Sequence, residues 1–241
     1  VKICGGRQLA RRRLELFSRM NYLSHAIEFL DRPLFMASTG VPDMLSVIDR
    51  KVRIRRKALE PFFNDTDPAV VEVARGIAQH LDDDRWFHAN KVFQQLNSEF
   101  SQAIRDVHPD DESMRPWFLG HIVIELLLDA HLSQQNPGAL EKYYENMEAV
   151  DATFIQGFIN KAAKRPTYDF VRLFDAFQRE QFLFDYADDD RLAYRLNQVM
   201  KRVGLEQFDD TVSVLFSGFR ERVLTLQHEL LSPDTIQTTN I

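Results

Sequence analysis

Residues 76–88 read GIAQHLDDDRWFH, a stretch whose histidines and acids repeat with helical spacing. His80, Asp84 and His88 follow one another at intervals of four residues. On an α-helix each such step turns about 40° and rises about 6 Å, so the three side chains line one face. A histidine four residues from a carboxylate is a pair that can bind a divalent metal. Because the outer two residues are about 12 Å apart along the axis, they would do different jobs or serve two ions.

Residues 118–132 repeat this design in the sequence FLGHIVIELLLDAHL. His121, Glu125 and Asp129 keep the interval of four, and apolar residues surround them on nearly every side, which is typical of a buried helix. A buried carboxylate must be paired, protonated or metal-bound, because leaving it uncompensated costs several kcal/mol. Two helices of this kind favour one shared metal centre. The alternatives are a solvated acidic face for the first stretch and a buried structural ion pair for the second.

The remaining sequence indicates a single all-α domain. Apolar residues recur with a period of about 3.6 in most of the chain, and no segment alternates as a strand would. Nine glycines and nine prolines are too few for a loop-rich β-sandwich. We therefore predict roughly eight to nine helices in one domain at residues 20–231. A polar tail is expected at residues 232–241.

Composition and charge exclude several classes of protein. The apolar fraction of 44% and the charged fraction of 27% are ordinary for a globular protein, and the single cysteine, Cys4, excludes an internal disulfide. No apolar run reaches the about 18 residues of a membrane span, so we expect a cytoplasmic protein without one. Residues 1–19 carry six basic residues against one acid, and without them the formal charge changes from −6 to −11. So acidic a body argues against nucleic-acid binding.

The basic start of the chain differs from the rest. We interpret residues 1–19 as upstream sequence or a disordered arm, with a short basic amphipathic helix as the alternative. His25 follows in an apolar helical stripe at residues 21–30, and Asp43 follows a break at Gly40. Both are candidate metal ligands from separate helices, although Asp43 also suits a helix N-cap.

A cluster of positive charge comes next. Residues 50–57 read RKVRIRRK and hold six basic residues out of eight. One interpretation is a solvated connection; the other is an anion-attracting rim for a phosphorylated small molecule or an acidic partner protein. In the second interpretation we assign substrate or partner binding to Arg53, Arg55 and Arg56.

Four of these features together resemble the bacterial acyl-carrier-protein phosphodiesterase family, a divergent all-helical relative of the HD-type metal phosphohydrolases. They are MNYLSH at residues 20–25, GVPDML at 40–45, GI-x2-H-x3-D-x3-H at 76–88, and H-x3-E at 121–125. By position, motif residues of the family match directly at His25, Asp43, His80 and Asp84. His88 stands where the family tends to have Asp, and His121 where it tends to have the first of two acids. Glu125 matches the second acid as a carboxylate.

The resemblance implies an HD-like core and hydrolysis of the phosphodiester that joins 4′-phosphopantetheine to a carrier-protein serine. It also implies a divalent metal, Mn²⁺ first and Fe²⁺, Mg²⁺ or Zn²⁺ as alternatives, held by His25, Asp43, His80, Asp84, His121 and Glu125. Such a metal would bind a phosphoryl oxygen and lower the pKa of a water molecule. Asp83 or His88 would carry the proton to the leaving serine oxygen. The basic cluster would suit an acidic carrier protein.

Two other functions stay open at this point. A similar order of histidines and acids occurs in zinc-dependent phospholipase C-like proteins, so the substrate of a metal phosphohydrolase could instead be a phospholipid or a nucleotide. A non-enzymatic helical module, with structural histidines and acids, is the third hypothesis. The sequence contains no Gly-rich phosphate loop and no G-x-S-x-G motif that would point to another chemistry.

Overall fold

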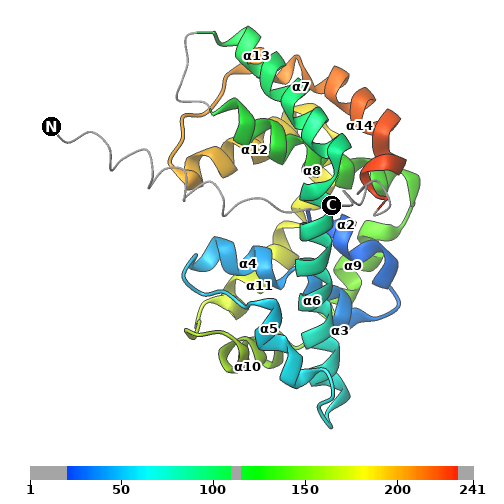
Figure 1. The fold of residues 1–241 in the computed structure, drawn as a ribbon, viewed down its shortest axis with the longest axis vertical. Coiled ribbons are helices and arrows are strands. Elements are labelled where there is room, and N and C mark those ends of the chain that lie inside the picture. The colour runs from blue at the N-terminus through cyan, green and yellow to red at the C-terminus, as the bar shows by residue number, and fades with distance from the viewer. Residues whose placement is uncertain (1–20, 110–114, 233–241) are drawn as a thin grey trace, which may run out of the picture. The chain divides into compact units, whose positions relative to one another are not determined.

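A computed structural model describes residues 21–109 and 115–232, whose regular structure is helical throughout (Figure 1). These residues form thirteen α-helices and three short 3-10 helices, with no strand among them. The all-α prediction is confirmed, whereas the HD-like core stays a prediction. The helices outnumber those predicted because short ones divide longer stretches: Gly40 separates α3 (Pro33–Thr39) from α4 (Val41–Ile48). The predicted arm at residues 1–19 and most of the predicted polar tail lie outside the described residues.

The chain divides into two compact units. Of the described residues, the first unit comprises those up to Asp84 together with Glu141–Glu180, and the second comprises those of Arg85–Leu140 together with those from Gln181 onward. The division falls inside α6 (Pro68–Ala89), where the sequence has no Gly- or Pro-rich linker to mark it. The single domain predicted for residues 20–231 stays a prediction.

The first unit is built around α6 and short helices from the start of the chain. Gly76 of α6 lets α3 approach closely, because a Cβ at this position would lie 2.7 Å from the Cβ of Ser38. The ring of Tyr22 packs edge-on against Phe177 at 4.7 Å, which joins α2 (Tyr22–Ala26) to α11 (Phe170–Glu180). Besides α3, α4 and most of α6, its described helices are α2 (Tyr22–Ala26), η1 (Ile27–Phe29), α5 (Arg56–Leu59), η2 (Glu60–Phe62), most of α9 (Ala139–Glu148), α10 (Ala152–Ala162) and α11 (Phe170–Glu180).

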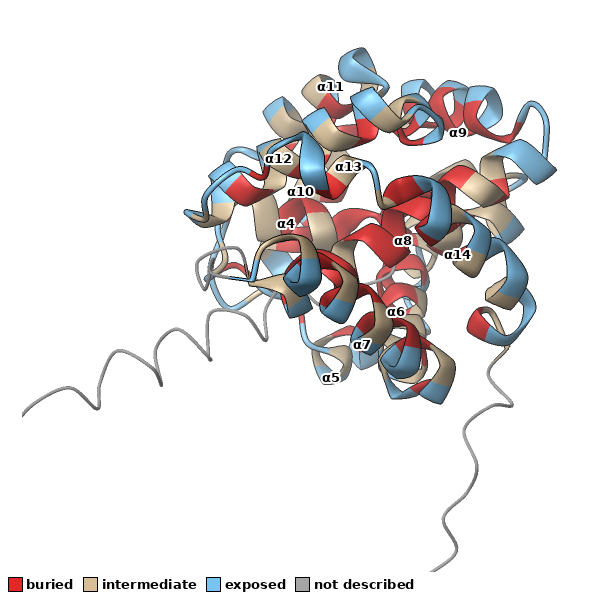
Figure 2. Cartoon of the chain, turned by 90° about the horizontal axis from the view of Figure 1, so that it is seen from above, coloured by how far each residue is buried: buried red, intermediate tan, exposed pale blue. Residues whose placement is uncertain are grey.

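The second unit is centred on a pair of long helices, α7 (Lys91–Val107) and α8 (Pro116–Gln135). Gly120 allows their close packing, because a Cβ there would lie 2.9 Å from Oδ1 of Asn97. Figure 2 shows α8 buried along most of its length, as its apolar sequence predicts. The other helices of this unit are η3 (Phe182–Ala187), α12 (Asp189–Val203), α13 (Asp210–Ser213) and α14 (Phe216–Leu230).

Hydropathy separates α8 from a membrane helix. It is apolar, yet His121, Glu125 and Asp129 interrupt it within 20 residues. Among the described residues, none of the helices combines the length and the hydropathy needed to cross a bilayer.

Candidate metal centres

Six of the predicted site residues gather in two groups, one in each unit. Group 1, defined by His25, His80 and Asp84, lies in the first unit. Group 2, defined by His88, His121 and Glu125, lies in the second. Within each group, nitrogen and oxygen atoms suitable as metal ligands all lie within 4.8 Å of one another. Either group could therefore hold a metal ion, while the single shared centre suggested by the sequence stays a prediction.

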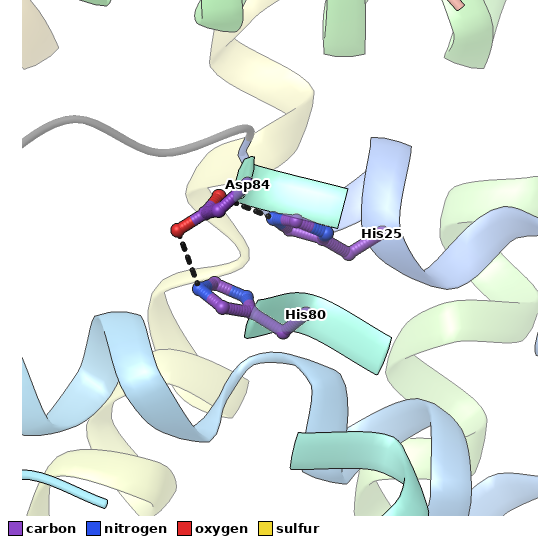
Figure 3. Close-up of side chains that lie close together, drawn as sticks. All are labelled: His25, His80 and Asp84. Atoms are coloured by element: carbon purple, nitrogen blue, oxygen red, sulfur yellow. Dashed lines mark ion pairs between the residues drawn. The ribbon is translucent and has the colours of Figure 1, made fainter. Parts of the chain in front are cut away.

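Group 1 brings α2 and α6 together around one carboxylate. His80 and Asp84 lie one turn apart on α6, and His25 of α2 completes the group (Figure 3). Nε2 of His25 lies 3.5 Å from Oδ1 of Asp84, and Nε2 of His80 lies 3.4 Å from Oδ2. Each carboxylate oxygen of Asp84 thus faces one imidazole. The side chains of His25 and His80 are completely buried.

The separations in group 1 suit ligands of a shared ion better than direct hydrogen bonds. A charge-assisted N–H···O bond is about 2.7–2.9 Å long, which is shorter than either contact to Asp84. Two ligand atoms bound to one tetrahedral ion, each at about 2.0–2.1 Å, lie about 3.3 Å apart. The observed 3.4 and 3.5 Å are close to that value.

His80 gives the strongest indication of a ligand. Neither of its ring nitrogens makes a hydrogen bond within the described residues, although both are buried. Apart from Asp84, its Nε2 has Oδ1 of Asp43 at 4.0 Å, beyond hydrogen-bonding distance. A buried polar group left unsatisfied costs about 1–3 kcal/mol. An ion between His80 and the neighbouring carboxylates would remove that cost.

Asp83 supports group 1 from behind His25. Its Oδ2 lies 3.2 Å from Nδ1 of His25, and its Oδ1 accepts a hydrogen bond of 2.8 Å from Nε2 of Gln79. A carboxylate on one imidazole nitrogen commonly orients the other nitrogen toward a metal. The contact therefore favours a positioning role for Asp83 over the proton-transfer role predicted for it.

The ionisable side chains of group 1 shift one another's pKa values. Burial alone would lower the pKa of His25, but its contact with Asp83 and the negative charges of Asp83 and Asp84 outweigh that effect and raise the pKa to about 10. Burial would likewise raise the pKa of Asp84, but the imidazoles of His80 and His25 beside its two oxygens hold that pKa well below its usual range. Without a metal, His25 is thus an imidazolium between two carboxylates, and a divalent ion would have to displace its proton.

Group 2 combines the last turn of α6 with the middle of α8. Nε2 of His121 lies 2.8 Å from Oε1 of Glu125, and Nε2 of His88 lies 3.5 Å from the same oxygen. The two imidazoles stack at 5.0 Å, and the ring of Phe93 packs edge-on against both. Glu125 is buried, as predicted.

The two groups differ in how well their polar atoms are satisfied. In group 2, His121 and Glu125 form a hydrogen bond of ordinary length, so a buried structural pair accounts for both. Nε2 of His88 is buried and makes no hydrogen bond within the described part of the chain, so it alone indicates a further ligand. Group 1 is therefore the better candidate for a catalytic metal.

The three predicted arginines have different surroundings. Arg56 pairs with Asp82 at 3.0 Å and lines a cavity of about 380 Å³ in the first unit. Arg55 and Arg53 are exposed, and Arg53 donates to the carbonyl of Arg50 at 2.9 Å. None of the RKVRIRRK residues other than Arg56 lines this cavity.

Two other arginines line the same cavity and were not predicted from the sequence. They are Arg32 and Arg75, which are isolated in the sequence and not part of a basic cluster. The one available signal was the position of Arg75, five residues before His80 in the helix of group 1.

Comparison with protein families, curated proteins and solved structures finds no match for this chain. The resemblance to carrier-protein phosphodiesterases accordingly stays a prediction. The geometry of the two groups, and of group 1 above all, is the basis on which a function can be proposed.

Proposed function

We propose that the protein is a metal-dependent phosphodiester hydrolase whose catalytic ion is held by group 1. The observation that carries the proposal is His80, a completely buried imidazole with two nitrogens that make no hydrogen bond within the described residues. Two imidazoles and a carboxylate form a ligand set suited to Mn²⁺, Fe²⁺ or Zn²⁺. We place Mn²⁺ first, as the resemblance implies.

The residues of group 1 would share the work as follows. An ion bound there would polarise a phosphoryl oxygen and lower the pKa of a water molecule toward neutrality. Asp83 and Gln79 would hold the ring of His25 in place. Asp43, whose side chain is 15% exposed and whose Oδ1 lies 4.0 Å from His80, would add a ligand or accept the proton of the attacking water.

The specific substrate that we propose is the phosphodiester between 4′-phosphopantetheine and the serine of an acidic carrier protein. It rests on the resemblance of the motifs in residues 20–132, and it would place the protein in the cytoplasm. A nucleotide or phospholipid diester is the alternative substrate for the same centre. Group 2 would hold a second ion or act as a structural pair.

The experiment begins with the metal content of protein purified without chelator. We expect at least one equivalent of a divalent ion, Mn²⁺-stimulated hydrolysis of bis-p-nitrophenyl phosphate, and loss of activity on chelation. His80→Gln should lose both metal and activity, whereas the matched control His228→Gln, at an exposed position of α14, should retain both. Wild-type protein that binds no divalent ion would refute the proposal.

A substrate panel then separates the candidate substrates. Holo-carrier protein, nucleotide diesters and phosphatidylcholine are compared at equal enzyme and Mn²⁺ concentrations. Release of 4′-phosphopantetheine at the highest kcat/KM supports the carrier-protein substrate. A preference for either of the other two assigns the centre to that class of diester.

A further inference from the structure

The cavity in the first unit has the composition of an anion-binding site. Its volume is about 380 Å³, and three arginines line it: Arg32, Arg56 and Arg75. Phenylalanine side chains, Phe35 and Phe63 among them, form apolar parts of the wall. A cavity of this size falls within the range of small-molecule sites, about 300–1,000 Å³.

Arg32 is held in a fixed orientation. It donates two hydrogen bonds to Glu72, from Nη2 at 2.6 Å and from Nε at 3.2 Å. Its guanidinium also stacks over the ring of Phe35, with Cζ 4.0 Å from the centroid. A guanidinium fixed in this way loses little further conformational entropy when it binds a ligand.

Arg56 is fixed by the same means on another element. Its Nε donates to Asp82 at 3.0 Å, and its Cζ lies 4.8 Å from the centroid of the Phe63 ring. Because Nε makes this ion pair, the terminal nitrogens of Arg56 remain for another acceptor. Each of these two guanidinium groups is therefore oriented by a carboxylate of α6 and by a phenylalanine ring, and both groups line one cavity.

Arg75 supplies the charge that no carboxylate offsets within the described residues. Its one hydrogen bond there is a long one, 3.4 Å from Nη2 to the carbonyl of Phe63. Glu72 and Asp82 balance the other two arginines, so the cavity keeps a net positive charge. A guanidinium binds phosphate through paired hydrogen bonds, which makes a phosphate group the fitting ligand.

The cavity lies next to group 1 on the same helix. Its lining includes Gln79 and Asp82 of α6, which alternate in sequence with His80 and Asp83. Gln79 also donates to Asp83, the carboxylate that contacts Nδ1 of His25. A ligand in the cavity would therefore be bound within the same unit as the candidate metal and next to its supporting residues.

We propose that this cavity binds the phosphate group of a small phosphate ester, with the phenylalanines in contact with its organic part. The proposal deepens the proposed function. It rests on that function in one respect, namely that the bound phosphate ester is the substrate of the hydrolase. Binding itself does not need the metal. This independence allows the two proposals to be tested apart.

The test measures binding of phenyl phosphate and of inorganic phosphate by calorimetric titration of the chelator-treated 241-residue chain at low ionic strength. We expect phenyl phosphate to bind more tightly, because its ring gains apolar contacts. Arg75→Ala should weaken phenyl phosphate binding about 10-fold or more, the usual loss for a hydrogen bond to a charged group. Arg172→Ala, an equal charge change on an 84%-exposed side chain of α11, should leave binding unchanged.

A second variant and four outcomes complete the test. Arg32→Lys keeps the charge but loses the paired hydrogen bonds, and we expect it also to weaken binding. Absence of phosphate binding, or binding insensitive to Arg75, overturns the proposal whatever the metal content. Equal affinity for phenyl phosphate and inorganic phosphate overturns the proposal that the ligand is an ester, and assigns the cavity to inorganic phosphate. A poly-glutamate peptide that binds through Arg75 while phenyl phosphate does not would assign the cavity to an acidic protein. Phosphate binding in protein that takes up no metal would instead refute only the hydrolase.

Discussion

Asp83 lies 3.2 Å from Nδ1 of His25, on the side of the imidazole opposite Nε2, which faces Asp84. Gln79 holds Asp83 in turn. Three successive contacts thus fix the direction of one nitrogen in group 1. Such outer contacts commonly matter to metal sites almost as much as the ligands do.

The first prediction concerns this support. Asp83→Asn should lower the affinity of group 1 for Mn²⁺ or Zn²⁺ about 10- to 100-fold, because the neutral amide no longer orients and polarises His25. The matched control is Asp82→Asn, the adjacent residue of α6, whose carboxylate pairs with Arg56 instead. Competitive titration against a metallochromic indicator measures both. Equal affinities in Asp83→Asn and wild type would show that Asp83 does not support a ligand.

The second prediction concerns Glu125. If group 2 binds an ion, Glu125→Gln should weaken that site about 10- to 100-fold, as loss of a ligand charge does. Stability of the metal-free protein should change little, because Gln needs no counter-charge. A buried structural pair predicts the reverse: a loss of about 3–5 kcal/mol in unfolding free energy with metal content unaltered. Metal analysis and urea denaturation of the same preparations distinguish the two.

The third prediction tests the packing of α7 on α8. Gly120→Ala should destabilise the protein by about 1–3 kcal/mol, because the new methyl group would overlap Asn97 and crowd Ser101. Gly218→Ala in α14 is the control, since among the described residues no side chain or other segment comes within 4 Å of its added Cβ, apart from its chain neighbours and the backbone of its own helix. That change should stabilise the helix by up to about 1 kcal/mol. Urea midpoints that move in the same direction for both variants would contradict the close packing.

The fourth prediction is a pH effect at a surface pair between α7 and α14. A hydrogen bond from Gln95, together with the hydrogen bond and charge of Arg222, holds the pKa of Glu99 below its usual value. A lowered carboxyl pKa stabilises the fold above the unfolded-state pKa, and that stability is lost as pH falls through the folded-state pKa. Arg222→Gln should raise the Glu99 pKa and cost less than about 1 kcal/mol at neutral pH, because the pair is exposed. NMR titration of the Glu99 carboxyl carbon measures the shift; an unchanged pKa would contradict the contact.

Helical periodicity in the sequence predicted much of the fold. His80 with Asp84, and His121 with Glu125, lie on common faces because an interval of four residues places them there in any helix. The burial of Glu125 followed from the apolar residues around it. Spacing along one helix, however, does not say which other helix packs on that face. The pairing of His25 with α6 and of His88 with α8 depends on tertiary packing, so the sequence alone did not separate the six residues into two groups.

The cavity lined by the three arginines likewise could not be predicted from sequence, because it depends on which helices pack together. A run of basic residues is visible in sequence, yet only Arg56 of that run reaches the cavity. Arg32 and Arg75 come from separate segments, and their common environment depends on the packing of α3 against α6. The short helices were also missed, because four-residue elements such as α5 and α13 are too short to show a periodic pattern.

Gly76 allows the close packing of α3 against α6, and this packing affects the size of ligand that the cavity could hold. A methyl group at this position would push against Ser38 and the backbone of Phe35, and so drive α3 away from α6. Arg32 and Phe35, at the start of α3, form one wall of the cavity, whereas Arg75 belongs to α6. The width of the cavity therefore depends on a residue that does not itself line it. Substitution at Gly76 would alter the width of the cavity, and so which ligands fit, without replacing any of its charged residues.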